Sequence, residues 1–147
     1  MKTLREIMRP GFIFGVQRDA SVADAARTMT TNNVGIVAVF GGDRLIGVFS
    51  ERDLVRRVVY RGLDPAHTPV ADVMTTDLVV AQADDDYQSA MRAMDQANIR
   101  HLPVVSGDHL LSMLSIRDLM RVDLDDKGHE IRTLHEYLYQ VPPGGAG

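Results

Sequence analysis

The chain has 147 residues, 45% of them hydrophobic and 24% charged, and its formal net charge is -4. This composition is typical of a globular domain that can bury a core, and the absence of a basic excess argues against a primary role in nucleic-acid binding. Because the sequence holds no cysteine, disulfides, thiol catalysis and thiolate metal sites are excluded.

The N-terminus shows no targeting pattern. Lys2 and Arg5 are not followed by an apolar segment, and no run of the sequence approaches the roughly 18 apolar residues that a membrane span needs. We therefore expect a cytoplasmic protein that does not contact a membrane. None of the histidines lies at ligand spacing from a second metal-binding side chain, so the sequence predicts no metal site.

Helical and strand patterns alternate in the first half of the chain. Ser21 can cap a helix in which Val22, Ala25 and Met29 recur at helical spacing. A short apolar run rich in β-branched residues follows, and then a turn with two glycines. The predicted elements are a helix over residues 21–31, strands over 34–40 and 44–49 joined by a turn at 41–43, and a helix from 50 to about 61.

The second half repeats this order after a connection that contains two prolines. We expect a strand over residues 78–80, a helix over 86–97, strands over 102–105 and 110–114, a helix from 115 to about 122, and a polar turn at 123–127. An amphipathic helix over 128–140 and a disordered tail follow. The corresponding boundaries are 1–62 for the first motif, 63–69 for the connection, 70–123 for the second motif, 124–141 for the C-terminal helix and 142–147 for the tail.

The two halves are copies of one unit, and this internal repeat is the most informative feature of the sequence. Each copy alone would be marginally stable, so we expect the two to share a core and to be related by an approximate two-fold axis. A duplicated unit also predicts two similar sites rather than one catalytic centre. Residues about 65 positions apart match, including Ser50 with Ser115, Arg52 with Arg117, Asp53 with Asp118, Met29 with Met94, and Ile7-Met8 with Val73-Met74.

The repeated unit resembles a known regulatory motif. The likeness is carried by the run Ile46-Gly47-Val48-Phe49-Ser50-Glu51-Arg52-Asp53-Leu54, the run Arg100-His101-Leu102-Pro103-Val104-Val105, and Met8 and Met74. A strand, a helix, two strands and a helix, repeated once, is similar to a tandem pair of cystathionine-β-synthase (CBS) motifs, the Bateman module. The resemblance implies an α/β (α+β) fold of two β-α-β-β-α motifs packed with pseudo-two-fold symmetry, followed here by the short C-terminal helix.

The resemblance also implies adenine-nucleotide binding between the two motifs, with AMP, ADP, ATP, NAD or S-adenosylmethionine as typical ligands. In the family, the ribose-binding aspartate of one motif works with two segments of the other motif. Carried over to this sequence, one site combines Ser50, Arg52 and Asp53 with Leu78, Val79, Val80, Ile99, Arg100 and His101. The other site combines Ser115, Arg117 and Asp118 with Phe12, Ile13, Phe14, Val34, Gly35 and Ile36.

The chemistry of the two aspartates agrees with a ribonucleotide ligand. A carboxylate only accepts hydrogen bonds and a ribose offers two adjacent hydroxyl donors, so Asp53 or Asp118 can hold a ribose through charge-assisted bonds. A phosphate beside Ser50 or Ser115 would lie at a helix N-terminus. The same Ser-x-x-Asp spacing is also that of a capping box, which would explain both pairs structurally without any ligand.

The two copies differ in ways that favour the site holding Asp53. Gly47 would let a ligand approach the backbone closely, and copy two has Ser112 at this position. The Asp53 site also receives two cations, Arg100 and His101, from the other motif. The second site lacks such cations, and could be empty or take a less charged ligand.

We therefore interpret the chain as a regulatory module that senses adenine nucleotides and signals through conformation or oligomer state, and not as an enzyme. Family members commonly dimerise, so the resemblance implies a homodimer that acts on an unidentified effector protein, with no obligatory cofactor. The face of Ile131, Leu134 and Leu138 either covers the module or contacts a second subunit. Two alternatives stay open: a binder of an NAD-type dinucleotide, and an interaction or dimerisation scaffold that binds no ligand.

Overall fold

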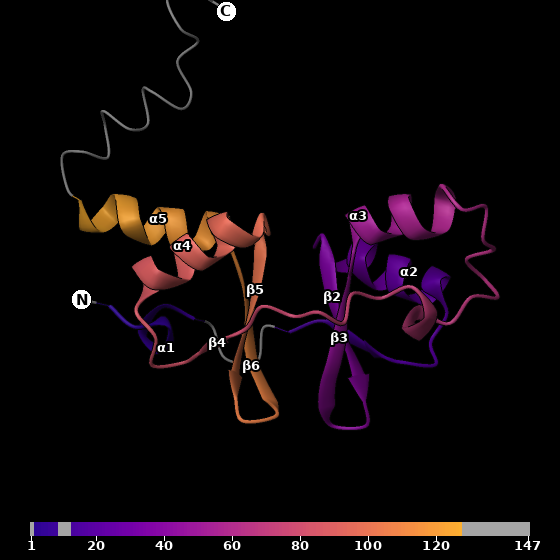
Figure 1. Ribbon diagram of the computed structural model, residues 1–147, viewed down its shortest axis with the longest axis horizontal. Helices are drawn as coiled ribbons and strands as arrows, with labels where there is room; N and C mark the ends of the chain where they lie inside the picture. The colour runs from indigo at the N-terminus through magenta and orange to yellow at the C-terminus, as the bar shows by residue number, and fades with distance from the viewer. Residues whose placement is uncertain (1, 9–12, 128–147) are drawn as a thin grey trace, which may run out of the picture.

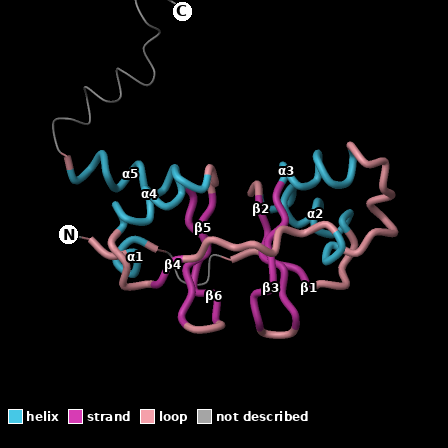
Figure 2. Tube along the Cα trace, viewed as in Figure 1, coloured by secondary structure: helices cyan, strands magenta, loops and turns pink. Residues whose placement is uncertain are grey.

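The computed structural model describes residues 2–8 and 13–127. Figures 1 and 2 show two halves side by side, with the longer helices along one edge and the hairpin turns of the sheets at the opposite edge. The elements are, in chain order, α1 (Leu4–Ile7), β1 (Gly15–Gln17), α2 (Val22–Asn32), β2 (Ile36–Gly41), β3 (Arg44–Ser50), α3 (Glu51–Asp53), a π-helix (Leu54–Val59), a 3₁₀ turn (Val70–Asp72), β4 (Ala81–Gln82), α4 (Tyr87–Ala97), β5 (His101–Ser106), β6 (His109–Ser115) and α5 (Ile116–Asp126).

The two sheets have the same topology and the same irregularity. β1 pairs parallel with β2, which pairs antiparallel with β3, and β4, β5 and β6 repeat this order. In each sheet the register shifts once, after Val39 in β2 and after Val104 in β5. β3 and β6 contact each other where the halves meet. This duplicated architecture confirms the predicted tandem α+β repeat.

Equivalent residues begin and end the long helices α2 and α4. Ser21 caps α2 and Asp86 caps α4, each by accepting a hydrogen bond from the amide three residues later, at 3.1 Å and 3.3 Å. Both helices end at an asparagine in the left-handed conformation, Asn33 with φ 53° and Asn98 with φ 54°. Asparagine adopts this conformation more readily than most other residues. The chain therefore turns into β2 and β5 at equivalent points.

Each half has its own hydrophobic core, and a segment from outside that half's repeat completes it. We define the linker as residues 60–80, which join the π-helix to β4. Val70 and Val73 of the linker belong to the core of the first half, while Leu4 of α1 belongs to the core of the second half. All three side chains are at most 3% exposed. The prediction of one shared core is therefore wrong. Each half has a core of its own, and the halves exchange segments, because α1 of the first copy packs in the core of the second half.

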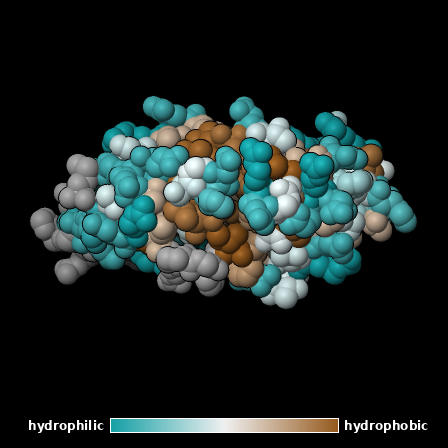
Figure 3. Space-filling model, turned by 90° about the horizontal axis from the view of Figure 1, so that it is seen from below, coloured by the Kyte–Doolittle hydropathy of each residue, from teal (hydrophilic) through white to brown (hydrophobic). Residues whose placement is uncertain are grey.

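Large apolar side chains stay exposed at both ends of the linker within the described residues. Val55, Val59, Tyr60 and Leu63 lie on and after the π-helix, and Val79 and Val80 lie just before β4. Seen from below in Figure 3, hydrophobic residues gather around the middle of the face, whereas hydrophilic residues predominate towards its ends. Apolar side chains are thus found at the surface as well as in the two buried cores.

Two elements of the second half differ from their predicted bounds. The strand expected at residues 78–80 is β4 at 81–82, because pairing with β5 begins only at Ala81. α5 continues to Asp126, through the residues expected to form a polar turn. The acidic run stays helical because Asp123 within it is hydrogen-bonded and paired with Lys127. The predicted helix at 128–140 and the predicted tail lie outside the described residues.

The helix that follows β3 is mostly π-helical, which the sequence did not predict. After α3, residues Leu54–Val59 have π-helical hydrogen bonding, and the Tyr60 amide donates to the Val55 carbonyl at 2.9 Å. This turn carries Arg57, whose guanidinium donates to linker carbonyls. Such turns are often found at functional sites, and the apolar spacing of a sequence does not distinguish them from α-helix.

A buried polar pair in the second half replaces an apolar pair of the first. Tyr87 donates from its hydroxyl to Asp123 Oδ1 at 3.0 Å, and Lys127 Nζ lies 3.0 Å from Asp123 Oδ2. The equivalent residues about 65 positions earlier are Val22 and Val58, both fully buried. Equivalent buried positions therefore hold a hydrogen-bonded pair in one half and two members of the hydrophobic core in the other.

We expect Tyr87→Phe to lower the free energy of unfolding by about 1–2 kcal/mol, because Asp123 stays buried with one donor fewer. Burial, with hydrogen bonds to Asp126 and Asp123, raises the pKa of Tyr87 to about 12, above its usual 10.0. Stability from this raised pKa is present below pH 10 and is lost as the pH rises towards 12. Urea denaturation at neutral pH and at about pH 11 should therefore show a larger alkaline loss for the wild type than for Tyr87→Phe.

Tyr60→Phe is the matched control for this experiment, because Tyr60 is 87% exposed. Its alkaline loss of stability should equal that of the wild type. An equal loss in the wild type and in Tyr87→Phe would contradict the role given to the buried pair.

Candidate functional site

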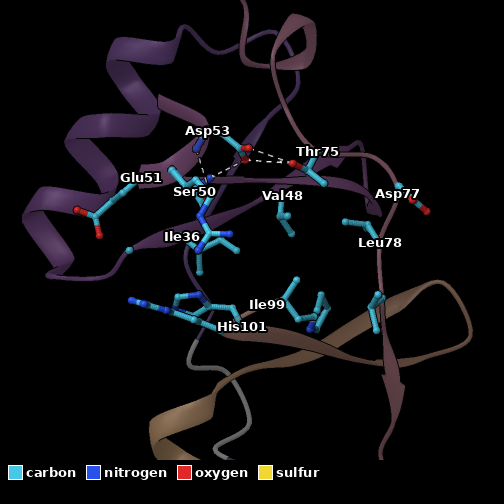
Figure 4. Close-up of a pocket in the computed structure, with 15 residues that line it drawn as sticks. Ile36, Val48, Ser50, Glu51, Asp53, Thr75, Asp77, Leu78, Ile99 and His101 are labelled. Atoms are coloured by element: carbon cyan, nitrogen blue, oxygen red, sulfur yellow. Dashed lines mark hydrogen bonds between the residues drawn. The ribbon is translucent and has the colours of Figure 1, made fainter. Parts of the chain in front are cut away.

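A cavity of about 290 Å³ lies between the two halves, beside the start of α3. Figure 4 shows Asp53 and Thr75 at one edge of it and Ile99 and His101 at the opposite edge. Because both halves supply its walls, the cavity depends on their packing. Its lining consists of Gly35, Ile36, Val48, Ser50, Glu51, Arg52, Asp53, Thr75, Asp77, Leu78, Val79, Ile99, Arg100, His101 and Pro103.

Asp53 is the buried carboxylate at the edge of this cavity, and its residue is 8% exposed. A capping box holds it: the Ser50 amide donates to Asp53 Oδ2 at 3.1 Å, and the Asp53 amide donates to Ser50 Oγ at 3.1 Å. The structural explanation of the Ser-x-x-Asp spacing is therefore correct for this pair. The box uses one of about four acceptor positions of the carboxylate, so it is compatible with a ligand at the others.

Two further groups contact the Asp53 carboxylate from outside the capping box. The Thr75 hydroxyl donates to both oxygens, at 3.1 Å to Oδ1 and 3.2 Å to Oδ2, and Arg57 Nε lies 3.7 Å from Oδ1. Arg57 also donates to the carbonyls of Val73 and Met74, at 3.3 Å and 2.8 Å. The linker is thus tied to the carboxylate directly through Thr75 and indirectly through Arg57.

Gly47 lets the linker, rather than a ligand, approach β3. The backbones of Val48 and Thr75 exchange two hydrogen bonds, of 3.0 Å and 2.8 Å. A Cβ atom at Gly47 would lie 2.6 Å from Met74 Sδ and 2.9 Å from the Thr75 carbonyl oxygen, so a side chain there would displace the linker. The close approach to a ligand that the sequence predicted for Gly47 is therefore replaced by a close approach of protein backbone.

The opposite wall of the cavity combines apolar surface with charge. Ile99, Arg100 and His101 lie between the end of α4 and the start of β5. Arg100 is exposed and His101 is half-buried. Over the whole lining, Arg52, Arg100 and His101 can carry positive charge, and Glu51, Asp53 and Asp77 can carry negative charge. The cavity can therefore offer both donors and acceptors to a polar ligand.

The structure brings together nearly all residues predicted for the first site. The exception is Val80, which does not line the cavity and is 42% exposed. Val80 lies directly before β4, which begins at Ala81. The predicted residues that share the cavity are Ser50, Arg52, Asp53, Leu78, Val79, Ile99, Arg100 and His101.

The residues predicted for the second site are not gathered in the same way. Ser115 and Asp118 form a capping box at the start of α5, with hydrogen bonds of 3.0 Å and 3.1 Å. Asp118 and its neighbour Arg117 are exposed, unlike the buried Asp53. Phe14 packs against the core of the first half. For this aspartate the structure shows the cap, and residues 2–8 and 13–127 form no enclosing walls around it comparable with those around Asp53.

Gly35 and Ile36, which the sequence assigned to the second site, line the cavity beside Asp53 instead. The reason is local, because the Glu51 amide donates to the Gly35 carbonyl at 3.0 Å and so holds the start of β2 against α3. Val34 and Gly35 also line an adjoining cavity of about 320 Å³ at the end of α2. Of the remaining predicted residues, Ile13 is partly buried and Phe12 lies outside the described residues.

Sequence reasoning missed several residues of the cavity, of which Thr75 has the closest contact with Asp53. The sequence offered one hint of its role, because Thr75 directly follows Met74, one of the residues that mark the repeat. Its contact with Asp53 joins residues 22 positions apart, and no sequence pattern indicates that contact. The lining residues that were not predicted are Val48, Glu51, Thr75, Asp77 and Pro103.

Within residues 2–8 and 13–127, no group of three or more histidine, aspartate or glutamate side chains is placed to hold a metal ion. Among the helices of the same ranges, none has both the length and the apolar character needed to cross a membrane.

The duplicated sheets, the exchanged segments and the cavity between the halves define a tandem CBS pair. The family model of the CBS domain matches residues 4–60 and 70–125, so the chain belongs to the CBS-domain family. The two matched ranges correspond to the two copies of the repeat. The resemblance inferred from the sequence is therefore confirmed.

Known proteins of the family share the fold at moderate identity. The chain is 33% identical over 125 residues to CBS domain-containing protein CBSX3, mitochondrial, of Arabidopsis thaliana; the match covers 82% of this chain but only 61% of that relative. A solved structure of a protein with CBS domains from Burkholderia ambifaria has a TM-score of 0.79 at 29% identity, covering 85% of this chain and 96% of that one. CBSX2 in complex with AMP has a TM-score of 0.73 at 24% identity, covering 86% and 99%, and shows the fold alone.

We expect the stability of the protein to fall as the pH drops below 6.5, in part through His101. Burial lowers the pKa of His101, and Arg100 lowers it too, against the opposing charges of Asp118 and Glu51. A base whose pKa is lower in the folded state loses stability as the pH falls below its usual value of 6.5, because the unfolded chain takes up the proton first. Urea denaturation at about pH 7.5 and about pH 5.5 should show a smaller acid loss for His101→Gln than for the wild type.

The matched control is His109→Gln, since His109 is exposed at the start of β6. It should show the acid loss of the wild type. If all three proteins lost the same free energy of unfolding, the burial of His101 would have no role in the pH dependence.

Proposed function

We propose that this chain is a regulatory module that binds an adenine ribonucleotide of the AMP, ADP or ATP type in the cavity beside Asp53. The observation that carries the proposal is the buried Asp53 carboxylate, which borders the cavity opposite Arg100 and His101 of the other half. A ribose offers donors to the carboxylate, and a phosphate accepts from the Arg100 guanidinium and from an imidazole N–H of His101.

Apolar side chains of the same cavity suit an adenine base. Ile36 and Val48 come from the first half, Leu78 from the linker and Ile99 from the second half. A flat base packs well between aliphatic side chains, and nearby backbone groups can read its polar edge. Base, ribose and phosphate thus each have a counterpart in one cavity.

The family supports the proposal, since CBSX2, which shares this fold, is known in complex with AMP. We propose no obligatory cofactor and no catalytic activity. The Ser50 hydroxyl accepts from the Asp53 amide, and the Asp53 carboxylate accepts from the Ser50 amide, so these two groups already hold each other in the capping box. This arrangement suits fixed recognition of a ligand rather than proton transfer.

We further propose that the chain works as a homodimer whose conformation or assembly an effector protein reads. Val55, Val59 and Tyr60 are 59%, 65% and 87% exposed, and they give the first half an apolar surface of the kind that partners cover. The ligand can shift such an equilibrium only by binding one state more tightly than the other. The signal therefore requires that the cavity differ between the two states.

A dinucleotide of the NAD type is a second candidate ligand, and one observation favours it. The adjoining cavity of about 320 Å³ shares Gly35 and Glu51 with the first cavity, so a longer ligand has space to extend along α3. The third candidate, S-adenosylmethionine, would place a positive charge near Glu51 instead of a phosphate near Arg100. A scaffold that binds no ligand is the remaining alternative.

Thermal unfolding with AMP, ADP, ATP, NAD and S-adenosylmethionine tests these proposals. A ligand at about 100-fold over its Kd adds about 2.7 kcal/mol to the free energy of unfolding, which corresponds to a few degrees in Tm. We expect such a shift with an adenine mononucleotide, and we expect Asp53→Ala to abolish it. Asp118→Ala is the matched control, because it removes the equivalent aspartate of the other capping box, and it should keep the shift.

Other outcomes would redirect the proposal. A larger shift with NAD than with AMP would identify a dinucleotide binder. A shift that Asp118→Ala removes and Asp53→Ala keeps would move the site to the second half. No shift with any of the five compounds at millimolar concentration would refute nucleotide binding and leave the scaffold.

A further inference from the structure

The protein itself engages Asp53 at the acceptor positions that a ribose would use. The Ser50 amide takes one position on Oδ2, and Arg57 Nε, 3.7 Å from Oδ1, lies beyond hydrogen-bonding distance. The Thr75 hydroxyl has a single proton, which it directs to both oxygens at 3.1 Å and 3.2 Å. One internal donor therefore covers both carboxylate oxygens on the side that faces Thr75.

A ribose would have to approach the carboxylate from the same side. Asp53 and Thr75 both line the cavity, and Figure 4 shows them facing one another at its edge. A ribose presents two neighbouring hydroxyls, one for each carboxylate oxygen. Of about four acceptor positions on the carboxylate, the Ser50 amide uses one and the shared Thr75 proton lies across one on each oxygen, which leaves too few for two ribose hydroxyls. The ribose and Thr75 therefore compete for Asp53.

We propose that the Thr75 hydroxyl is an internal competitor for the ribose, and that it sets the affinity and the ribose selectivity of the cavity. The inference rests on the proposed function, in which the ligand is a ribonucleotide. In the empty cavity the hydroxyl keeps the buried carboxylate satisfied, which matters because a buried charge without donors is costly. Binding of a ribose replaces the shared hydrogen bond from Thr75 by two hydrogen bonds from the ligand. The free energy gained on binding is therefore smaller than it would be without the Thr75 hydroxyl.

Because Thr75 belongs to the linker, a bound ribose would also change how the linker contacts the first half. The Thr75 backbone stays bound to Val48 through hydrogen bonds of 3.0 Å and 2.8 Å, so displacement frees only the side chain. The hydroxyl contact joins the linker to α3, the element that holds Asp53. A bound ribose removes this contact and adds ligand contacts in its place. The linker connects the two halves, so the exchange occurs where a change of their relative position would begin.

The test compares the Kd of AMP and of 2′-deoxy-AMP, measured by isothermal titration calorimetry, in the wild type and in Thr75→Val. Valine keeps the shape of threonine and removes the hydroxyl, so we expect AMP to bind about tenfold more tightly, the worth of one hydrogen bond to a charged group. The preference for AMP over 2′-deoxy-AMP should rise, because the second ribose hydroxyl gains the acceptor that Thr75 has released. Thr75→Ser restores the donor and should bind as the wild type does.

Thr76→Val is the matched control, because Thr76 is exposed and does not line the cavity. It should leave both dissociation constants unchanged. Thr75→Ala provides a second variant without the hydroxyl, and urea denaturation shows that each variant is folded before its affinity is compared. AMP binding that is unchanged or weaker in both hydroxyl-free variants would overturn the competition and make Thr75 a residue that only positions Asp53.

The two proposals fail in different ways. If the wild type binds AMP, Asp53→Ala does not, and Thr75→Val binds no more tightly, only the competition is refuted. If neither the wild type nor the folded Thr75→Val variant binds any ribonucleotide, both proposals are refuted together. Binding that appears only when the hydroxyl is removed would support the competition in its strongest form.

Discussion

The packing of the linker on the first half is the interaction on which the rest of this structure depends. Val70 and Val73 enter the core of that half, and the backbone of Thr75 pairs with β3. The pairing is possible only because Gly47 has no side chain, since a Cβ atom there would lie within 3 Å of the linker. The linker is therefore held against the first half at Thr75, and the linker residues that follow, including Leu78, line the cavity beside Asp53.

The opposite exchange makes the dependence mutual. Leu4 of α1 is fully buried in the core of the second half, although α1 belongs to the first copy in the sequence. A unit of about 60 residues buries too little apolar surface to be stable alone. Each half here gains a buried segment from outside its own repeat, so neither core is complete without the rest of the chain. The two walls of the cavity belong to different cores. The cavity therefore depends on both exchanged segments.

The features that the sequence could predict depend on contacts between residues that are close along the chain. α2 and α4 follow from their apolar spacing and caps, because Ser21 and Asp86 act within one helical turn. The internal repeat and the family resemblance also led to most of the residues around Asp53, because matched motifs in a known family have matched positions. The start of β4, the π-helix and the role of Gly47 depend instead on contacts between distant segments. Thr75 belongs with them, because its partner Asp53 is near only after the linker has packed.

The two copies keep one backbone plan but use their polar side chains differently. Tyr87 and Asp123 hydrogen-bond within the helix packing of the second half, where the first half has buried valines. The buried carboxylate of the first half is Asp53, at the cavity edge, whereas the equivalent Asp118 is exposed. An exposed carboxylate is already well solvated and gains little from a ligand hydroxyl, whereas a buried one has replaced water by protein donors that a matching ligand can displace. Burial of Asp53, more than the motif that both aspartates share, is therefore the physical reason to propose a ligand site beside this aspartate and not beside Asp118.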